Sequence, residues 1–273
     1  MTYKDIVCRL KNASIEDAES EAVLLLEHYC MANRAHVFSF PDEDYSGPAL
    51  AEAIKRRVRR EPLQYILGEW GFFGESYFVD ENCLIPRADT EILVEKAIVS
   101  LPHGARFADL CTGSGCIAIS TLRHREDCSA LALDLFPKTL ELARKNARHN
   151  GVEARLSFRL ADILRSDALD GEEPFDAILS NPPYIRTSVL PSLAKELKAE
   201  PRAALDGGED GLVFYRAILE HHGKLLKENG FILFEIGFDQ QSDLEALAAQ
   251  YGYTAEIGYD LSGNVRTALL RKI

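Results

Sequence analysis

Four residues that follow an apolar stretch combine hydrogen-bond acceptors with a stiff backbone. Residues 175–179 (FDAIL) are typical of a buried strand, and Asn181, Pro182, Pro183 and Tyr184 follow almost at once. Prolines fix φ and donate no N–H, so this turn cannot prolong a sheet. The Asn181 side-chain oxygen and the Pro182 carbonyl are two acceptors that can each take one N–H of a planar amide or exocyclic amine. Tyr184 can pack on the flat face of such a group.

A second group of residues suits the binding of a small ligand by the backbone. Residues 109–115 (DLCTGSG) close one apolar segment and open a helical one. Gly113 and Gly115 permit a tight turn and close approach of a ligand, and the helix that follows offers free N–H groups. Without a third glycine at the usual offset, the turn does not favour a pyrophosphate. Asp109 either faces the ammonium group of a ligand or has a buried structural partner.

Two further acids stand at the ends of apolar segments. Asp134 ends the segment 130–134 (ALALD), where a carboxylate can accept hydrogen bonds from both hydroxyls of a ribose. Its alternative role is to cap a helix that begins near Pro137. Asp162 can accept from an adenine amino group, or it is an ordinary loop aspartate. Together with the missing glycine, these acids indicate a nucleoside without phosphates, and S-adenosylmethionine fits that description.

Methyl transfer from a sulfonium is an in-line displacement, so a protein has mainly to align the nucleophile and exclude water. The nitrogen of a planar amide is weakly reactive because its lone pair is delocalised. Two acceptors at Asn181 and Pro182 would fix that nitrogen and favour its pyramidal geometry in the transition state. No strong general base is required, since the proton becomes acidic only as the methyl group arrives. The alternative is that the turn at 181–184 is only a rigid structural turn with no role in catalysis.

The elements that must position these residues alternate between short apolar strands and helices. Strands are expected at 106–111, 129–133, 155–160, 175–179 and 231–236, and near 254–257 and 265–271. Helices are expected at 114–124, 137–149, 212–228 and 240–250. This alternation predicts an α/β fold, Rossmann-like and doubly wound, with a mostly parallel seven-stranded sheet. Such sheets bind ligands at the carboxyl ends of their strands.

The first part of the chain has a different pattern. Residues 1–64 indicate a small helical domain, with a capping box at 14–17 (SIED) before a helix at 18–28. Another helix, 48–60, ends at Glu61 and Pro62. Its basic run (Lys55, Arg56, Arg57, Arg59 and Arg60) favours a solvated helix end over a partner-binding patch. Residues 65–86 indicate a β-hairpin linker around 74–76, and the sheet domain follows at 87–273.

Composition limits the possible functions. The chain has 273 residues, is 47% hydrophobic and carries a formal charge of −12, which disfavours a general nucleic-acid binder. It shows no signal region and no apolar run long enough to cross a membrane, so we expect a cytoplasmic protein. Its six cysteines lack metal-type spacing and indicate buried thiols without a metal. The pair His221 and His222 favours an exposed helix face over a metal site, and nothing indicates self-association, so we expect a monomer.

NPPY at 181–184 is similar to the signature of S-adenosylmethionine-dependent methyltransferases that act on planar nitrogens of adenine, cytosine or glutamine. Other segments separate these groups: 64–74 (QYILGEWGFFG), 85–91 (IPRADTE), 200–211 (EPRAALDGGEDG) and 235–237 (EIG). Together they resemble the peptide-chain release factor glutamine methyltransferases, from about residue 60 to the end. The helical region before them also matches the layout of that family.

The resemblance implies a class I methyltransferase domain that methylates the side-chain amide (N5) of the glutamine in the Gly-Gly-Gln loop of a release factor. The product of the cofactor would be S-adenosylhomocysteine. By position, the cofactor would be lined by Asp109, Cys111, Thr112, Gly113, Ser114, Gly115, Asp134, Asp162, Ile163 and Asn181. The glutamine would be held by Asn181, Pro182, Pro183 and Tyr184, with Asn181 and Pro182 as the catalytic acceptors. Arg87 and Glu91 would shape the cavity.

The chain departs from the family pattern at four places. Cys111 replaces a common glycine, which is tolerable if its φ stays negative. Ala88 replaces a proline, Ile163 stands where an aromatic often packs on adenine, and 261–266 (LSGNVR) only partly matches the closing motif. The alternatives are a ribosomal-protein glutamine methyltransferase, an adenine-N6 nucleic-acid methyltransferase disfavoured by the charge, and a binding module that has lost its activity.

Overall fold

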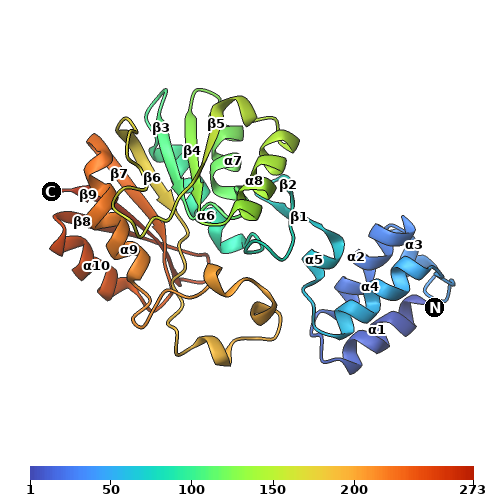
Figure 1. Cartoon of the computed structure of the whole chain (residues 1–273). Helices are drawn as coiled ribbons and strands as arrows, with labels where there is room; N and C mark the ends of the chain where they lie inside the picture. Colours follow the sequence, from blue (N-terminus) through green and yellow to red (C-terminus); the bar gives the residue numbers. More distant parts are fainter. The chain divides into compact units, whose positions relative to one another are not determined.

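The computed structural model describes all residues from 1 to 273, and they form two compact units (Figure 1). One unit contains Met1–Glu69 together with a short later segment, Ala194–Ala199. The other contains Trp70–Leu193 and Glu200–Ile273. None of the helices combines the length and the apolar character that a membrane crossing requires.

The first unit is helical, as expected. Its helices are α1 (Tyr3–Asn12), α2 (Ala18–Cys30), α3 (Arg34–Ser39), α4 (Pro48–Val58) and α5 (Leu63–Leu67). They bury a common apolar core that includes Ile6, Leu10, Leu25, Leu26 and Ile54. The capping box expected at 14–17 is wrong, because Ser14 has a φ of 59° and Asp17 makes no capping hydrogen bond. A capping box instead begins α1, where the Thr2 hydroxyl accepts from the Asp5 N–H and the Asp5 carboxylate accepts from the Thr2 N–H.

The basic end of α4 is not simply solvated. Arg57 is only 5% exposed, and its guanidinium donates to the Glu21 carboxylate at 2.6 Å and to Glu196 at 3.1 Å. Arg60 also pairs with Glu196. A buried guanidinium needs such partners, because an unpaired buried charge is costly. Glu196 comes from the segment Ala194–Ala199, which explains why that segment groups with the helices.

The expected hairpin is present, as β1 (Glu69–Phe72) and β2 (Glu75–Phe78). Its turn is two residues long and lies at Phe73 and Gly74, slightly before the expected position. Both turn residues have positive φ, 52° and 85°, as a tight turn between twisted strands requires. The Tyr77 hydroxyl then hydrogen-bonds Ser120 at 2.6 Å, which anchors β2 on the sheet domain.

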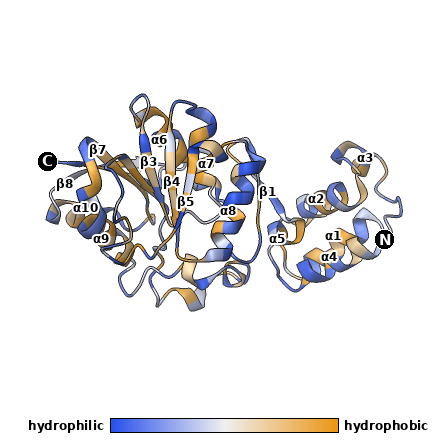
Figure 2. Cartoon of the chain, turned by 45° about the horizontal axis from the view of Figure 1, so that its top comes forward, coloured by the Kyte–Doolittle hydropathy of each residue, from blue (hydrophilic) through white to orange (hydrophobic).

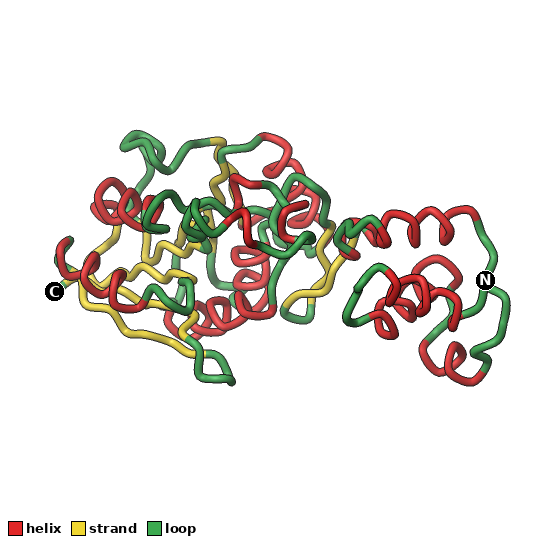
Figure 3. The backbone as a smooth tube through the Cα atoms, turned by 90° about the horizontal axis from the view of Figure 1, so that it is seen from below, coloured by secondary structure: helices red, strands yellow, loops and turns green.

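The second unit is built around a seven-stranded sheet (Figures 1 and 3). Its strands are β3 (Arg106–Leu110), β4 (Ser129–Asp134), β5 (Leu156–Leu160), β6 (Phe175–Ser180), β7 (Leu226–Glu235), β8 (Tyr253–Tyr259) and β9 (Val265–Lys272). Their order is β5-β4-β3-β6-β7-β9-β8, and only the pairs that involve β9 are antiparallel. The sequence prediction of a mostly parallel, doubly wound sheet of seven strands is confirmed. The order reverses beside β3, so a ligand site is expected at the carboxyl ends of β3, β4 and β6.

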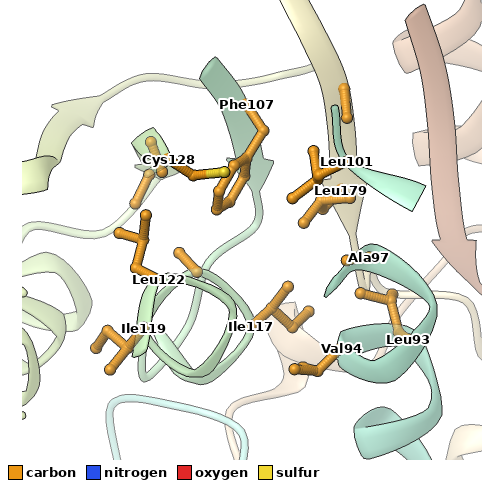
Figure 4. Packing of buried hydrophobic residues seen from close by; sticks show 14 of the residues in the cluster. Leu93, Val94, Ala97, Leu101, Phe107, Ile117, Ile119, Leu122, Cys128 and Leu179 are labelled. Atoms are coloured by element: carbon orange, nitrogen blue, oxygen red, sulfur yellow. The ribbon is translucent and has the colours of Figure 1, made fainter. Parts of the chain in front are cut away.

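Helices cover both faces of this sheet. Residues of α6 (Ala88–Ser100), α7 (Cys116–His124) and α8 (Pro137–His149) pack on one face. Figure 4 shows Leu93 of α6 and Ile117 of α7 beside Phe107 of β3. Residues of α9 (Val213–Ala217) and α10 (Gln241–Gln250) pack on the other. The hydropathy colouring shows apolar strands within this domain and hydrophilic stretches along its outer helices (Figure 2).

Two elements differ from the sequence predictions. Helix α6 was not predicted, because its apolar and polar residues are poorly segregated between its faces. The helix expected at 212–228 is shorter, since α9 continues as a π-helical turn (Ile218–His222) and a 3-10 turn (Gly223–Leu225) before β7 begins. The remaining short 3-10 turns are Glu153–Arg155, Leu190–Ser192, Leu197–Ala199 and Arg202–Ala204.

Candidate active site

A cavity of about 460 Å³ lies at the carboxyl ends of β3, β4 and β6. Of the residues predicted for the site, it is lined by Cys111, Thr112, Gly113, Ser114, Asp134, Asp162, Ile163, Asn181 and Pro183. Four others, Asp109, Gly115, Pro182 and Tyr184, are not among the residues that line it. The volume is in the ordinary range for a small-molecule site. Residues from three strand ends and from the turn after β6 thus converge on one space.

The glycine-rich turn between β3 and α7 forms one wall of the cavity. Gly115 has a φ of 84°, which strains a residue with a side chain, and a Cβ atom there would lie 2.9 Å from Ile119 Cδ1, so the Ile119 side chain would have to move. The Thr112 N–H donates to the Leu133 carbonyl at 2.9 Å and ties the turn to β4. At Gly113, by contrast, a Cβ atom would meet no neighbour within 4 Å. A ligand can therefore approach the backbone closely at Gly113.

Asp109 stabilises this turn by hydrogen bonds. It is fully buried, and its Oδ2 accepts from the Thr112 hydroxyl at 2.6 Å and from the Ala118 N–H at 3.3 Å. Burial raises the pKa of Asp109 to about 7, against the lowering effect of these hydrogen bonds. The sequence left two roles open for Asp109, contact with the ammonium group of a ligand and hydrogen bonding to buried structural partners. These contacts favour the structural role.

The condition under which a cysteine at position 111 would be tolerable, a negative φ, is not met. The φ of Cys111 is 60°, in the left-handed region, where a residue with a side chain costs roughly 1–2 kcal/mol. The strain is tolerated at the first residue after β3, where the chain must turn sharply towards α7. Burial raises the pKa of the Cys111 thiol, so the side chain stays protonated in the cavity wall.

Asp134, the predicted ribose acceptor, ends β4 and lines the cavity. Its Oδ2 accepts from the Gly113 N–H and its Oδ1 from the Phe136 N–H, each at 3.1 Å. These bonds lower its pKa, but the larger effect of burial raises it above the ordinary value. Each carboxylate oxygen retains a second lone pair. Asp134 therefore links the glycine-rich turn at Gly113 to the start of the loop at Phe136, and it can still accept hydrogen bonds from a ligand.

The loop after β5 brings Asp162 and Ile163 to the cavity. The Asp162 carboxylate accepts from the Leu164 N–H at 3.0 Å, and the buried Ile163 faces the same space. The expectation of an exposed histidine pair is wrong for His222, which is fully buried and hydrogen-bonds the Ile163 carbonyl through Nε2 at 2.8 Å. No group of three or more His, Cys, Asp or Glu side chains is placed to hold a metal ion.

The turn after β6 forms the opposite wall. Ser180 is buried and donates its hydroxyl to the Leu110 carbonyl at 2.6 Å, so the end of β6 is fastened to β3. Asn181 then lines the cavity, and its amide nitrogen donates to the Thr90 hydroxyl at 3.2 Å. The Tyr184 hydroxyl donates to the buried Glu235 at 3.3 Å, and burial raises the pKa of Tyr184. The Asn181 side-chain oxygen makes no hydrogen bond of its own within the protein.

A glycine-containing segment braces this turn. The Ile185 N–H donates to the Leu205 carbonyl at 3.0 Å, and the Gly207 N–H donates back to the Ile185 carbonyl at 2.8 Å. A Cβ atom on Gly207 would lie 2.7 Å from Tyr184 Cα and 2.8 Å from the Pro183 oxygen. Only glycine allows the two backbone segments to approach this closely. Gly207, within the segment 200–211, therefore supports the Asn-Pro-Pro-Tyr turn directly.

Arg87 and Glu91, for which the sequence left the roles open, differ in their contacts. Arg87 lines the cavity and forms an ion pair with the buried Glu200. The other oxygen of Glu200 accepts from the Ile85 N–H at 3.0 Å. Glu91 does not line the cavity, and its carboxylate accepts from the Phe73 N–H at 2.8 Å. Arg87 thus belongs to the cavity, whereas Glu91 holds the hairpin turn.

Sequence reasoning missed several lining residues. Leu135 and Phe136 are 50% and 45% exposed, directly after Asp134, and Leu164 is 39% exposed, directly after Ile163. The sequence signal that was available is the position of these apolar residues directly after a predicted ribose acceptor and a predicted adenine contact. Thr90 gave no such signal, because only the fold brings it next to Asn181.

Comparisons with known proteins agree with this arrangement. The family model described as the PrmC N-terminal domain matches residues 3–68, and the model described as the methyltransferase small domain matches residues 88–231. The second match covers more than half of the chain and includes the glycine-rich turn, Asp134, Asp162 and the Asn-Pro-Pro-Tyr turn. The first covers helices α1 to α5.

Curated relatives align over nearly the whole chain. A release factor glutamine methyltransferase of Nitratidesulfovibrio vulgaris is 37% identical over 272 residues, which cover 97% of this chain and 92% of the relative. A protein of the same name from Caulobacter vibrioides is 36% identical over 270 residues, covering 96% and 92%. Among solved structures, a methyltransferase from Pyrococcus furiosus aligns with a TM-score of 0.54 and 20% identity, covering 73% of this chain and 89% of that one. That likeness supports the fold alone.

Proposed function

The chain belongs to the family of release factor glutamine methyltransferases, and from this premise we propose that it methylates the side-chain amide nitrogen of a release factor glutamine. The methyl donor would be S-adenosylmethionine, which methyltransferases of this fold use generally. The substrate glutamine would be the one in the Gly-Gly-Gln loop that the sequence resemblance implies. The proposal rests on one observation: Asn181, Gly113, Asp134 and Asp162 all line the same cavity.

The donor set of the cavity fits S-adenosylmethionine. Asp134 retains lone pairs for ribose hydroxyls, and Asp162 with the Ile163 backbone can recognise an adenine edge. The open space at Gly113 accommodates the close approach of an amino-acid moiety, and Leu135 with Phe136 supplies an apolar border. When bound, the cofactor supplies an electrophilic methyl group on a positively charged sulfur. The remaining contributions come from the protein.

The protein would align the glutamine amide with that methyl group. Asn181 Oδ1 and the Pro182 carbonyl would each accept one N–H of the amide, which places its nitrogen lone pair in line with the sulfur–methyl bond. Tyr184, held by Glu235, would pack on the face of the amide. The cofactor would supply the methyl group, and Asn181 and the Pro182 carbonyl would hold the amide nitrogen that receives it and accept the N–H whose proton is then lost.

The helical unit would bind the release factor away from the reacting amide. The family match at residues 3–68 supports this role. Met31, Phe38 and Phe40 are 89%, 50% and 56% exposed on that unit and would be the first residues to test for contact with the release factor. We retain the boundaries 1–64, 65–86 and 87–273 for the helical domain, the linker and the methyltransferase domain. The protein would act as a monomer, in the cytoplasm where release factors function.

Transfer of labelled methyl groups to a purified release factor tests this proposal. The wild-type factor should incorporate label from S-adenosylmethionine, and a factor with its loop glutamine replaced by alanine should not. Incorporation into both factors would place the methyl group on another residue. If neither factor were labelled although calorimetry showed cofactor binding, the release factor would be the wrong substrate, and ribosomal proteins would be tested next.

A further inference from the structure

Two turns at the active-site edge of the sheet have no part in the mechanism above. Residues 236–240 follow β7, and residues 260–264 join β8 to β9. Because β6 and β7 are parallel while β9 is antiparallel to β7 and β8, both turns lie at the edge of the sheet that carries Asn181. Each turn presents a large apolar side chain to solvent, since Phe238 is 70% exposed and Leu261 is fully exposed.

The turn after β7 is fastened to the Asn-Pro-Pro-Tyr turn on both sides of Phe238. Gln240 is buried, and its Nε2 donates to the Tyr184 carbonyl at 3.2 Å. Asp239 accepts from the Arg186 guanidinium at 2.5 Å. Phe238 directly precedes these two anchored residues. Its exposure is therefore a feature of a fixed turn, which loses little conformational freedom when a partner covers it.

The turn between β8 and β9 is fixed in a similar way. The Asp260 carboxylate accepts from two backbone N–H groups of its own turn, at 2.8 and 2.9 Å. The Arg266 guanidinium then joins Asp260, at 3.0 Å, to Asp89, at 3.1 Å. Asp89 lies in the first turn of α6, directly before Thr90, which accepts from the Asn181 amide. This turn is thus also held in place relative to the active site.

The charged groups around the two exposed side chains form two clusters: Arg186 with Asp239 and Asp243, and Arg266 with Asp89 and Asp260. Each cluster contains one more carboxylate than guanidinium, so the surroundings are weakly acidic. Tyr259, which ends β8, is 54% exposed and adds a third large apolar side chain. Protein interfaces commonly have an apolar centre and a polar rim. Phe238, Tyr259 and Leu261, here called the apolar edge, suit an apolar segment with basic neighbours.

The position of the apolar edge indicates which molecule would cover it. A glutamine side chain that reaches Asn181 leaves the backbone of its protein outside the cavity. On one side of Asn181 the strand ends carry Asp134 and Asp162, which the cofactor would occupy. On the other side β7, β9 and β8 follow in order from β6 (Figure 1). The protein substrate would therefore lie over the turns at 236–240 and 260–264.

We propose that the apolar edge is a docking surface for the release factor. It would bind an apolar segment that lies beside the Gly-Gly-Gln loop and is flanked by Lys or Arg side chains. None of its three residues touches the reacting atoms. This inference rests on the proposed function, because it names where the substrate of that reaction binds outside the cavity.

Three variants of the full chain test the proposal. Phe238→Ser and Leu261→Ser, singly and combined, remove the apolar side chains without adding charge. Ile273→Ser is the matched control, because Ile273 is 87% exposed just after β9, at the opposite edge of the sheet. Methyl transfer at saturating S-adenosylmethionine gives kcat and the KM for a purified release factor. Fluorescence anisotropy gives the Kd of the labelled factor for the enzyme with S-adenosylhomocysteine, and calorimetry gives the affinity for S-adenosylmethionine.

Phe238→Ser and Leu261→Ser should each raise the KM and the Kd for the release factor about tenfold, because a large apolar side chain is no longer buried in the complex. The kcat and the affinity for S-adenosylmethionine should be unchanged, since the cavity is intact. Ile273→Ser should resemble the wild type. The Kd of the wild type should also rise with salt concentration, as expected for an acidic surface that meets basic side chains.

Several outcomes would overturn the inference. A double variant with the KM and Kd of the wild type would show that the release factor does not cover this surface. A lower kcat at an unchanged KM would show that the two turns support the active site instead. An equal loss in Ile273→Ser would show that the effect is not specific to this edge. Failure of the proposed function gives a different result, because the wild type itself would then neither bind nor methylate the factor.

Discussion

Gly207 offers a direct test of the idea that the turn at 181–184 must be held in place. A Cβ atom added at Gly207 would lie 2.7 Å from Tyr184 Cα and 2.8 Å from the Pro183 oxygen. Carbon atoms in contact normally lie about 3.5–4.0 Å apart, so Gly207→Ala must move one backbone segment by roughly 1 Å. A misplacement of about 1 Å in an aligned reaction can reduce the rate by about 10²-fold.

The assay compares methyl transfer and cofactor binding in Gly207→Ala and in a matched control. Gly71→Ala is a suitable control, because Gly71 is exposed on β1 and a Cβ atom there would meet nothing within 4 Å. We expect Gly207→Ala to lose about 10²-fold in the transfer rate with an unchanged affinity for S-adenosylmethionine, and Gly71→Ala to resemble the wild type. Full activity of Gly207→Ala would show that the turn need not be held by a glycine at this position, and a parallel loss of cofactor binding would show that the substitution disturbs the whole cavity.

Three further predictions concern the cofactor side of the cavity. Asp134→Asn should weaken S-adenosylmethionine binding about tenfold or more by calorimetry, since a charged acceptor of ribose hydroxyls is lost, and an unchanged affinity would contradict that role. His222→Phe should lower the free energy of unfolding by about 1–3 kcal/mol in urea titrations, because the buried Ile163 carbonyl loses its donor; an unchanged midpoint would refute this. Burial raises the pKa of Asp109 from 3.8 to about 7, so the folded protein retains a proton that the unfolded chain releases, and stability falls as pH rises across that interval. Asp109→Asn should remove this part of the pH slope of unfolding, and a slope like that of the wild type would contradict the assignment.

The sheet could be predicted from the sequence because its central strands are buried on both faces and therefore form continuous apolar runs. The acids and the Asn-Pro-Pro-Tyr turn stand directly where these runs end. Parallel strands bring their carboxyl ends to one edge, so Asp134, Asp162 and Asn181 could be expected to converge before their geometry was known.

Other features depend on contacts between residues far apart in the sequence. Thr90 meets Asn181 across 91 positions, and Arg57 meets Glu196 across 139. No local pattern marks either pair. The same is true of His222, whose neighbours in a helical stretch suggested exposure although its partner is the Ile163 carbonyl. The left-handed backbone of Cys111 was missed because the residue type argues against it, and only the sharp turn after β3 requires it.

We propose that the cavity aligns a glutamine amide for methyl transfer by means of Asn181. Tandem mass spectrometry of a release factor after incubation with S-adenosylmethionine tests it most directly, with the wild-type enzyme and Asn181→Ala in parallel. We expect one methyl group on the side chain of the loop glutamine with the wild-type enzyme, and almost none with Asn181→Ala although that variant still binds the cofactor. A methyl group on a different residue, or equal methylation by Asn181→Ala, would contradict it.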